Sequence, residues 1–233
     1  MAFVTLTALE LVLGIDNVIF ISILVDKLPA ETREKARKLG LFMAMFMRIG
    51  LLMALAWIVG LVTPLLTLGG HELTGRDLIM MSGGLFLLWK STTEIHQTLE
   101  GAAHDSTRSG HATFGSVIVQ IMVIDLVFSL DSIITAVGMV DQVEVMIAAV
   151  VASVGLMMLF ARGISHFVSE HPSIKMLALS FLVVVGVVLV AEGFEHHIPK
   201  GYVYFAMAFS VAVEMLNIKY RKKSNVIAKD LSE

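Results

Sequence analysis

The sequence predicts an all-α membrane protein with seven transmembrane helices, built as two inverted three-helix repeats plus a seventh helix. Two observations predict this class. The chain is 57% hydrophobic with a mean hydropathy of +0.84, and it contains several apolar runs of about twenty residues. A helix needs roughly 20 apolar residues to cross about 30 Å of hydrocarbon. The second observation is a polar motif that occurs twice within such runs.

The repeated motif places carboxylates inside apolar segments. Its two copies are Glu10-Leu-Val-Leu-Gly-Ile-Asp16-Asn17 and Asp125-Leu-Val-Phe-Ser-Leu-Asp131-Ser132. In both copies two acids lie six residues apart, and a small polar residue follows the second acid. Ionisable groups at membrane depth are costly and usually mark a functional site. We therefore expect a polar site where the two copies meet.

Seven apolar segments are separated by polar stretches that contain proline or glycine. The predicted spans cover about residues 3–25, 39–66, 77–95, 114–140, 143–167, 174–194 and 202–218. Within this single transmembrane domain of residues 1–233, the first repeat covers about 3–97, a linker 98–113, the second repeat 114–195, and the seventh helix with its basic tail 200–233. We expect residues 30–38 to form a separate amphipathic piece, Pro64 to end the second span, and residues 69–72 to form a turn.

Positive charge predicts the orientation of these spans. Lys and Arg gather in the first loop and in the tail, whereas the loops on the opposite side hold only Arg76 and Lys200. Loops rich in Lys and Arg stay in the cytoplasm. We therefore expect an external N-terminus and a cytoplasmic C-terminus. Three spans per repeat make the two copies point in opposite directions, which is typical of transporters with a site near the midplane.

The six-residue spacing of the acids constrains the site. Along a regular helix, six residues rise roughly 9 Å and turn about 240°. Glu10 and Asp16 therefore cannot face one ligand from an undisturbed helix. Either an unwound turn at Gly14, and at Ser129 in the second copy, redirects the second acid, or the spans supply two layers of acids. We expect a combination of the two.

In this arrangement each layer holds one acid from each repeat. Glu10 is expected at the depth of Asp131, and Asp16 at the depth of Asp125. Four converging carboxylates need a cation to remain ionised together. Oxygen donors suit Mn²⁺, Mg²⁺ or Ca²⁺, and the chain has no Cys for a soft-metal site. The candidate metal ligands are Glu10, Asp16, Asn17, Asp125, Asp131 and Ser132.

The alternative interpretation is that the acids only hold the bundle together, paired with Arg48 or Lys90, or relay protons. Supporting or relay roles are therefore open for Arg48, Lys90, Glu94, Met122, Glu192 and Glu214. Lys90 either reaches the cytoplasmic surface or pairs with Asp16 or Asp125. Glu94 and Glu192, near span ends, are expected as solvated interfacial carboxylates. Close helix contacts are predicted at Gly83, Gly84, Gly155 and Gly186.

No nucleophile–base pair and no phosphate-binding loop is visible, so we expect neither an enzyme nor a required cofactor. The chain also lacks a basic tract interleaved with aromatic residues, which excludes a typical nucleic-acid partner. The expected partners are a metal ion, as the transported substrate, and the lipid bilayer. Self-association into a homo-oligomer and association with the translocon remain open.

The two motif copies resemble the signature segments of the TerC family, membrane proteins named for tellurite resistance and related to LysE-type exporters. The segments Gly83-Gly-Leu-Phe-Leu-Leu-Trp-Lys90 and Lys175-Met-Leu-Ala-Leu-Ser-Phe-Leu-Val resemble its short subgroup, which has no appended regulatory domains. The resemblance covers almost the whole chain. It implies a seven-helix bacterial inner-membrane protein and, from the better-understood members, manganese efflux with the acids of both motifs as ligands.

The leading hypothesis is a secondary exporter of a divalent cation, Mn²⁺ first, with protons as the counter-ion on the same carboxylates. A second hypothesis is an accessory protein for membrane-protein assembly, or for loading metal into secreted proteins beside the translocon. The third is an amino-acid exporter, as the LysE-type relatives imply.

Overall fold

The computed structural model describes residues 2–54, 64–68, 71–100, 113–137, 142–196 and 198–230. Within these ranges, the side chains of residues 13, 15–16, 64–68, 71–72, 131, 134–137, 200 and 222–230 are not described. Two predicted metal ligands, Asp16 and Asp131, fall in this second group. The predictions about their contacts therefore lie outside the described residues.

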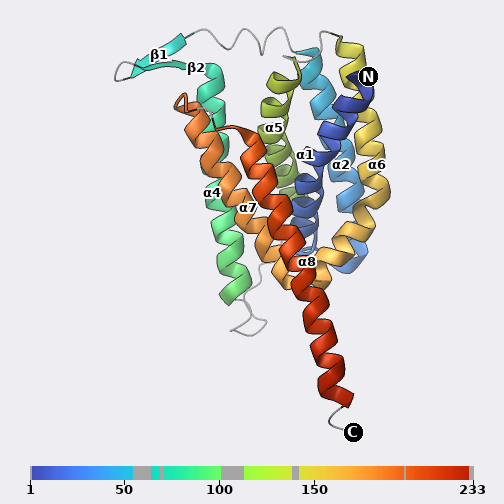
Figure 1. The fold of residues 1–233 in the computed structure, drawn as a ribbon. Coiled ribbons are helices and arrows are strands. Elements are labelled where there is room, and N and C mark those ends of the chain that lie inside the picture. Colours follow the sequence, from blue (N-terminus) through green and yellow to red (C-terminus); the bar gives the residue numbers. More distant parts are fainter. Residues whose placement is uncertain are drawn as a thin grey trace.

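Within the described residues the chain forms seven α-helices and one antiparallel β-hairpin (Figure 1). The helices are α1 (Ala2–Val25), α2 (Ala30–Met53), α4 (Gly75–Glu100), α5 (Phe114–Val137), α6 (Val143–Glu170), α7 (Pro172–Gly193) and α8 (Lys200–Asp230). By length and composition, α1, α6, α7 and residues 201–221 of α8 can each cross a membrane. The all-α membrane class is therefore confirmed, while seven spans, two inverted repeats and the orientation stay predictions.

The second helix differs from the prediction at both ends. α2 begins directly after Pro29, so residues 30–38 are its first turns and not a separate amphipathic piece. Pro64 does not close this helix but begins β1 (Pro64–Leu68), which pairs with β2 (His71–Thr74). The extension of the second span to residue 66 is therefore wrong, because residues 64–66 belong to the hairpin, in which Pro64 takes the first position of a strand, where a proline is tolerated.

The hairpin and the linker also change two smaller predictions. The predicted turn at residues 69–72 falls partly outside the described residues, and its last two residues belong to β2. The helix α4 continues to Glu100, so the predicted linker cannot begin at residue 98; residues 101–112 lie outside the description.

Both motif-bearing helices are continuous. α1 runs without a break through Gly14, and α5 runs through Ser129. The predicted unwound turn is therefore wrong in both copies, because a continuous helix already satisfies every backbone N–H and C=O that lipid would leave unpaired. Gly14 instead serves packing, since a Cβ at this position would collide with the side chain of Met157 on α6.

The helices divide into two groups, which Figure 1 shows side by side. In one group α1 packs along α6 and α5 packs along α2, with Val18, Phe20 and Leu24 of α1 in the hydrophobic core. In the other, α4 packs along α7. A long helix, α8, lies across the front of the bundle and continues past it.

The closest contact between helices joins α4 to α7. A Cβ at Gly84 would lie 2.7 Å from the carbonyl oxygen of Gly186, and a Cβ at Gly186 would lie 3.0 Å from that of Gly84. A Cβ at Gly83 would meet Val127 at 2.7 Å. The predicted close contacts at these three glycines are confirmed. At Gly155 nothing lies within 4 Å, so that prediction is wrong.

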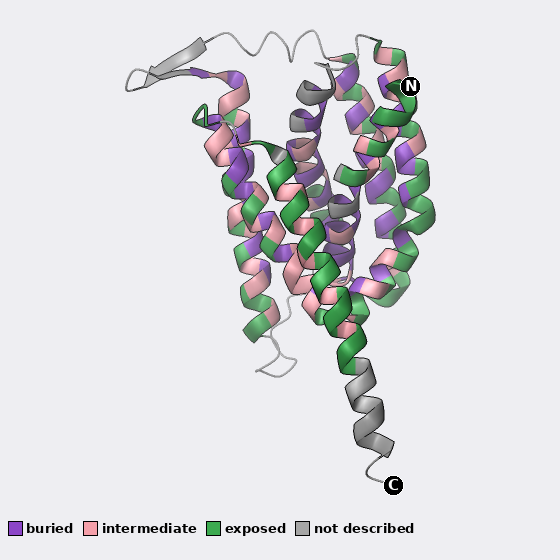
Figure 2. Cartoon of the chain, in the orientation of Figure 1, coloured by how far each residue is buried: buried purple, intermediate pink, exposed green. Residues whose placement is uncertain are grey.

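The last helix is longer than predicted. α8 extends to Asp230, so the basic tail expected after residue 218 continues as helix. No proline or glycine occurs between residues 202 and 230 to end it. Between residues 201 and 221 none of its side chains is buried (Figure 2). Such a surface suits a helix that faces lipid over its apolar part.

Candidate functional site

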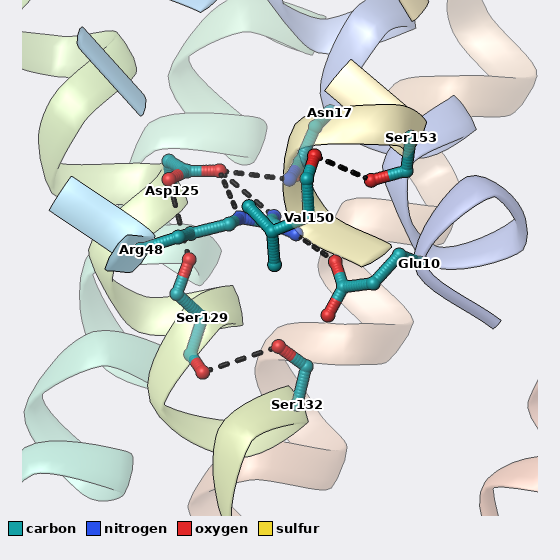
Figure 3. A network of polar contacts seen from close by, with 8 residues as sticks. All are labelled: Glu10, Asn17, Arg48, Asp125, Ser129, Ser132, Val150 and Ser153. Carbon is teal, nitrogen blue, oxygen red and sulfur yellow. Dashed lines mark hydrogen bonds and ion pairs between the residues drawn. The ribbon is translucent and has the colours of Figure 1, made fainter. Parts of the chain in front are cut away.

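A buried network of polar side chains joins α1, α2 and α5 (Figure 3). Arg48 of α2 lies at its centre. One guanidinium nitrogen, Nη1, donates to a carboxylate oxygen of Glu10, while Nη2 and Nε donate to Oδ1 of Asp125 at 2.9 Å and 3.3 Å. Nδ2 of Asn17 donates to the same oxygen at 3.1 Å, and the Ser129 hydroxyl donates to Oδ2 at 3.2 Å. One arginine therefore connects an acid from each copy of the motif.

Water has almost no access to this network. The exposed fractions are 6% for Glu10 and Asn17, and 4% for Arg48 and Asp125. Taking charged groups out of water is costly unless each one is paired and hydrogen-bonded. Two carboxylates and one guanidinium leave a net charge of −1 among the described side chains. The site is therefore both dry and short of one positive charge.

The sequence of α2 explains how Arg48 reaches this position. Its buried residues recur every four positions, as Ala36, Gly40, Ala44, Arg48 and Leu52. Small residues in such a stripe let neighbouring helices approach closely. At Gly40 a Cβ would lie 3.0 Å from Ile121 of α5, four residues before Asp125. The arginine continues the stripe, so its side chain enters the interface where the acid lies.

Two further features of the site concern space and free oxygen atoms. A cavity of about 10 Å³, the scale of one water molecule, adjoins the pair of Glu10 and Arg48. It is otherwise lined by apolar side chains, which are Leu6, Leu52, Ile133, Met146, Ala149 and Val150. Among the described residues, the buried Oδ1 of Asn17 and the buried hydroxyl of Thr7 have no hydrogen-bond partner. The amide oxygen of Asn17 is thus available to a cation.

The predicted ligands are only partly brought together. Glu10, Asn17 and Asp125 share the network, whereas the side chains of Asp16 and Asp131 are not described. Ser132 is buried, and its hydroxyl donates to the carbonyl oxygen of Ser129 at 3.1 Å (Figure 3). Among the described side chains, no group of three or more His, Cys, Asp or Glu residues could hold a metal ion.

The depth prediction can be compared with these contacts. The bond from Asn17 to Asp125 agrees with placing the C-terminal part of the first motif beside Asp125. The prediction did not foresee that Arg48 would connect Glu10 to Asp125 as well. The long side chain of Arg48 bridges Glu10 and Asp125, which the sequence assigns to two different layers of acids.

A second charged cluster surrounds Glu94 near the C-terminal end of α4. The carboxylate is 1% exposed, and its Oε1 accepts from Lys27 Nζ at 2.6 Å and from Lys90 Nζ at 2.7 Å. Lys27 also donates to Gln97 at 2.8 Å. The predicted solvated state of Glu94 is therefore wrong, because the turn after α1 brings a second ammonium group against this face of α4. Lys90 pairs with Glu94 and not with Asp125.

The remaining predicted residues take less central positions. Both carboxylate oxygens of Glu192, on the last turn of α7, are buried, so a solvated state is wrong there too. Met122 packs against the hydrophobic core. Glu214 is half-buried on α8 and accepts a hydrogen bond from Asn217 at 3.3 Å.

Comparison with known proteins identifies the family. The sequence model of the integral membrane protein TerC family matches residues 1–225. The chain belongs to the TerC family. Within this family of integral membrane proteins, the chain is 54% identical to the UPF0053 inner membrane protein YgdQ of Escherichia coli (strain K12), over 94% of this chain and 92% of that protein. The resemblance predicted from the two motifs is thereby confirmed.

Other TerC family relatives give the same picture. A UPF0053 protein of Haemophilus influenzae is 53% identical over 94% of this chain and 93% of its own length. The UPF0053 inner membrane protein YoaE of Escherichia coli (strain K12) is 53% identical over 91% of this chain, which spans 41% of that longer protein. The two Escherichia coli relatives are named as inner membrane proteins, and no catalytic family is indicated. No solved structure matches the chain.

Proposed function

We propose that this protein exports a divalent metal cation across the bacterial inner membrane, with Mn²⁺ as the first candidate. The observation that carries the proposal is the dry network in which Glu10 and Asp125, from distant parts of the chain, share one cationic group. Charged groups are rare inside membranes and usually lie on a substrate pathway. Apolar residues would hold the helices together at least as well as a buried ion pair does.

The chemistry of the donor atoms supports a hard or borderline cation. The network offers two carboxylates, together with an amide oxygen of Asn17 that has no partner among the described residues. Oxygen donors of this kind suit Mn²⁺, Mg²⁺ and Ca²⁺. The proposed ligand set remains Glu10, Asp16, Asn17, Asp125, Asp131 and Ser132. In this proposal a metal ion takes the position from which Arg48 now bonds to both acids.

The helix pairing supports a transporter architecture. If α1, α2 and α4 correspond to α5, α6 and α7, a two-fold axis relates the contact of α1 with α6 to that of α5 with α2. The same axis passes between α4 and α7, which pack on each other. This pattern favours two inverted repeats with a site at their interface. The proposal places the N-terminus outside the cell and the C-terminus in the cytoplasm, and makes the transport secondary, with protons as the counter-ion.

The experiment is Mn²⁺ flux in proteoliposomes that enclose a fluorescent metal indicator. We expect Glu10→Gln and Asp125→Asn to reduce the initial rate at least about tenfold, since each removes a charge from a site where lost charge pairing is costly. The matched control is Glu144→Gln, an exposed acid on the first turn of α6, which we expect to retain the wild-type rate.

Competition distinguishes the substrates. Excess Mg²⁺, Ca²⁺ and lysine are added separately, and inhibition by lysine alone would favour the amino-acid exporter. Wild-type rates no higher than those of protein-free liposomes, or full activity in both acid variants, would contradict the proposal.

A further inference from the structure

Arg48 occupies the place that a transported cation would need. Its guanidinium lies between Glu10 and Asp125 and donates to both carboxylates (Figure 3). It is the only cationic side chain in this network among the described residues. We infer that Arg48 is a tethered counter-cation: it competes with the metal for Glu10 and Asp125, and it compensates part of their charge when the carrier holds no metal. The inference rests on the proposed function.

Competition follows from the charges. Without a metal, two carboxylates and one guanidinium leave the described cluster at −1. A divalent ion on the same two carboxylates would balance them alone, and a nearby guanidinium would then repel it. Like charges in a medium of low dielectric constant repel far more strongly than in water. Metal and guanidinium therefore cannot share this pair of acids, and binding of one releases the other.

A metal can nevertheless make a first contact while Arg48 is in place. Oδ2 of Asp125 accepts a hydrogen bond from the Ser129 hydroxyl, and the guanidinium bonds only to Oδ1. The amide oxygen of Asn17, which has no partner among the described residues, lies on a side chain whose Nδ2 donates to Asp125. In this inference the metal makes its first contact at these two oxygens. A second ligand, Glu10, becomes available once the guanidinium leaves.

The departure of the guanidinium couples binding to helix movement. The cavity next to Glu10 and Arg48 is only about 10 Å³. A guanidinium is several times larger than the single water that such a space holds, so this cavity does not accommodate a displaced guanidinium. We therefore expect its release to shift α2 against α1 and α5. The small residues Ala36, Gly40 and Ala44 on the contact face of α2 offer no large side chains to interlock against such a shift.

The consequence for the transport cycle is specific. An exporter must return without metal after each release, and carboxylates that lack both a metal and a counter-ion make that step costly inside a membrane. With Arg48 between the two acids, the guanidinium compensates one of their two negative charges, and the proposed counter-ion, a proton, compensates the other. Net efflux includes this empty return, whereas exchange of metal for metal across the membrane does not. Loss of the tethered cation therefore harms net efflux more than exchange.

The test compares net efflux with exchange of isotopic Mn²⁺ in proteoliposomes for Arg48→Gln. We expect the ratio of net efflux to exchange to fall at least about tenfold, because the emptied acids then lack their cation. We also expect Mn²⁺ to bind the detergent-solubilised variant at least about threefold more tightly, because the competing group is gone. A residue with a merely structural role would weaken binding and both fluxes together.

The matched control is Lys38→Gln, which removes one positive charge from the same helix at an exposed pair with Glu34. We expect it to keep the wild-type ratio. Arg48→Lys serves if Arg48→Gln does not fold. A single ammonium group does not bridge two acids as a guanidinium does. The ratio of net efflux to exchange for Arg48→Lys should therefore lie between the wild-type ratio and the tenfold lower ratio expected for Arg48→Gln.

The experiments distinguish a failure of the proposed function from a failure of the proposed role of Arg48. If the wild type carries no Mn²⁺, the proposed function is wrong. If the wild type carries Mn²⁺ but Arg48→Gln keeps both its flux ratio and its affinity, only the tethered cation is wrong. Folded Arg48→Gln protein that no longer binds Mn²⁺ would also overturn it.

Discussion

The two buried charge clusters of this protein are opposites. At one, a single cation, Arg48, lies between the acids Glu10 and Asp125; at the other, a single acid, Glu94, lies between Lys27 and Lys90. One cluster has an excess of negative charge and the other an excess of positive charge. The two excess charges differ in their access to solvent, and that access decides what each cluster can do.

Solvent can stabilise the excess charge only in the cluster around Glu94, at the end of α4. The side chains of Lys27 and Lys90 are 30% and 13% exposed, so their excess charge reaches water. All charged members of the Arg48 network are at most 6% exposed. An excess charge in that position is compensated by a bound cation or by protonation of one of the acids. The comparison shows why the two acids, and not Glu94, form the candidate cation site.

The largest expected effect comes from breaking the dry cluster. Asp125→Ala leaves Arg48 with one partner and removes the acceptor of Asn17 and Ser129. We expect the free energy of unfolding to fall by about 3–5 kcal/mol, because buried donors of Arg48, Asn17 and Ser129 lose their acceptor, each at a cost of about 1–3 kcal/mol. Unfolding by SDS in mixed micelles, followed by circular dichroism, measures the change. A loss below about 1 kcal/mol, typical of an exposed pair, would contradict the comparison.

A smaller effect is expected at the other cluster. Glu94→Gln keeps the size of the side chain and lets both lysines turn toward water, so we expect a loss of about 1–2 kcal/mol. Salt should shrink this loss, because Lys27 is partly exposed and its interaction is screened. The same unfolding assay at about 0.1 M and 1 M NaCl measures it. Equal salt dependence for Asp125→Ala and Glu94→Gln would show that solvent does not separate the two clusters.

The smallest expected effect concerns the single hydrogen bond from Ser129 to Asp125. Ser129→Ala removes the hydroxyl that donates to Oδ2, while the contacts of Oδ1 with Arg48 and Asn17 remain. We expect a loss of about 1 kcal/mol, the net value of one hydrogen bond. Ser180→Ala provides the control, because its hydroxyl bonds only to a carbonyl of its own exposed helix face. If both variants lose the same amount, the contact with Asp125 contributes nothing of its own.

The sequence was sufficient to find the acids and to name Arg48 as a candidate partner, but not to show that Arg48 bridges two of them. Hydropathy shows which residues lie at membrane depth, so Glu10, Asp125 and Arg48 could all be identified as buried charges. It does not show which helices are neighbours, and the bridge through Arg48 therefore could not be predicted. A usable signal was present in the four-residue recurrence of small residues that ends at Arg48.

Other predictions failed because they were made from the neighbouring residues in sequence, whereas contacts with distant segments determine the structure at those positions. Gly14 was interpreted as a break, but it fits α1 against Met157 of α6 within a regular helix. Glu94 was assigned to the solvated interface because it lies near a helix end, but the turn that carries Lys27 covers it. In both cases the deciding atoms come from a segment distant in sequence, which a pattern along one helix cannot reveal.

The contact between Gly84 and Gly186 brings the backbones of α4 and α7 close together, and Val190 and Leu88 lie next to the two glycines. If α4 rotates about this contact, Glu94 moves with it. Glu94 lies ten residues from Gly84, a lever arm of about 15 Å. A rotation of about 10° would move Glu94 by roughly 2.6 Å over that arm. Such a swing separates Glu94 from Lys27, while Lys90 travels with it on the same helix.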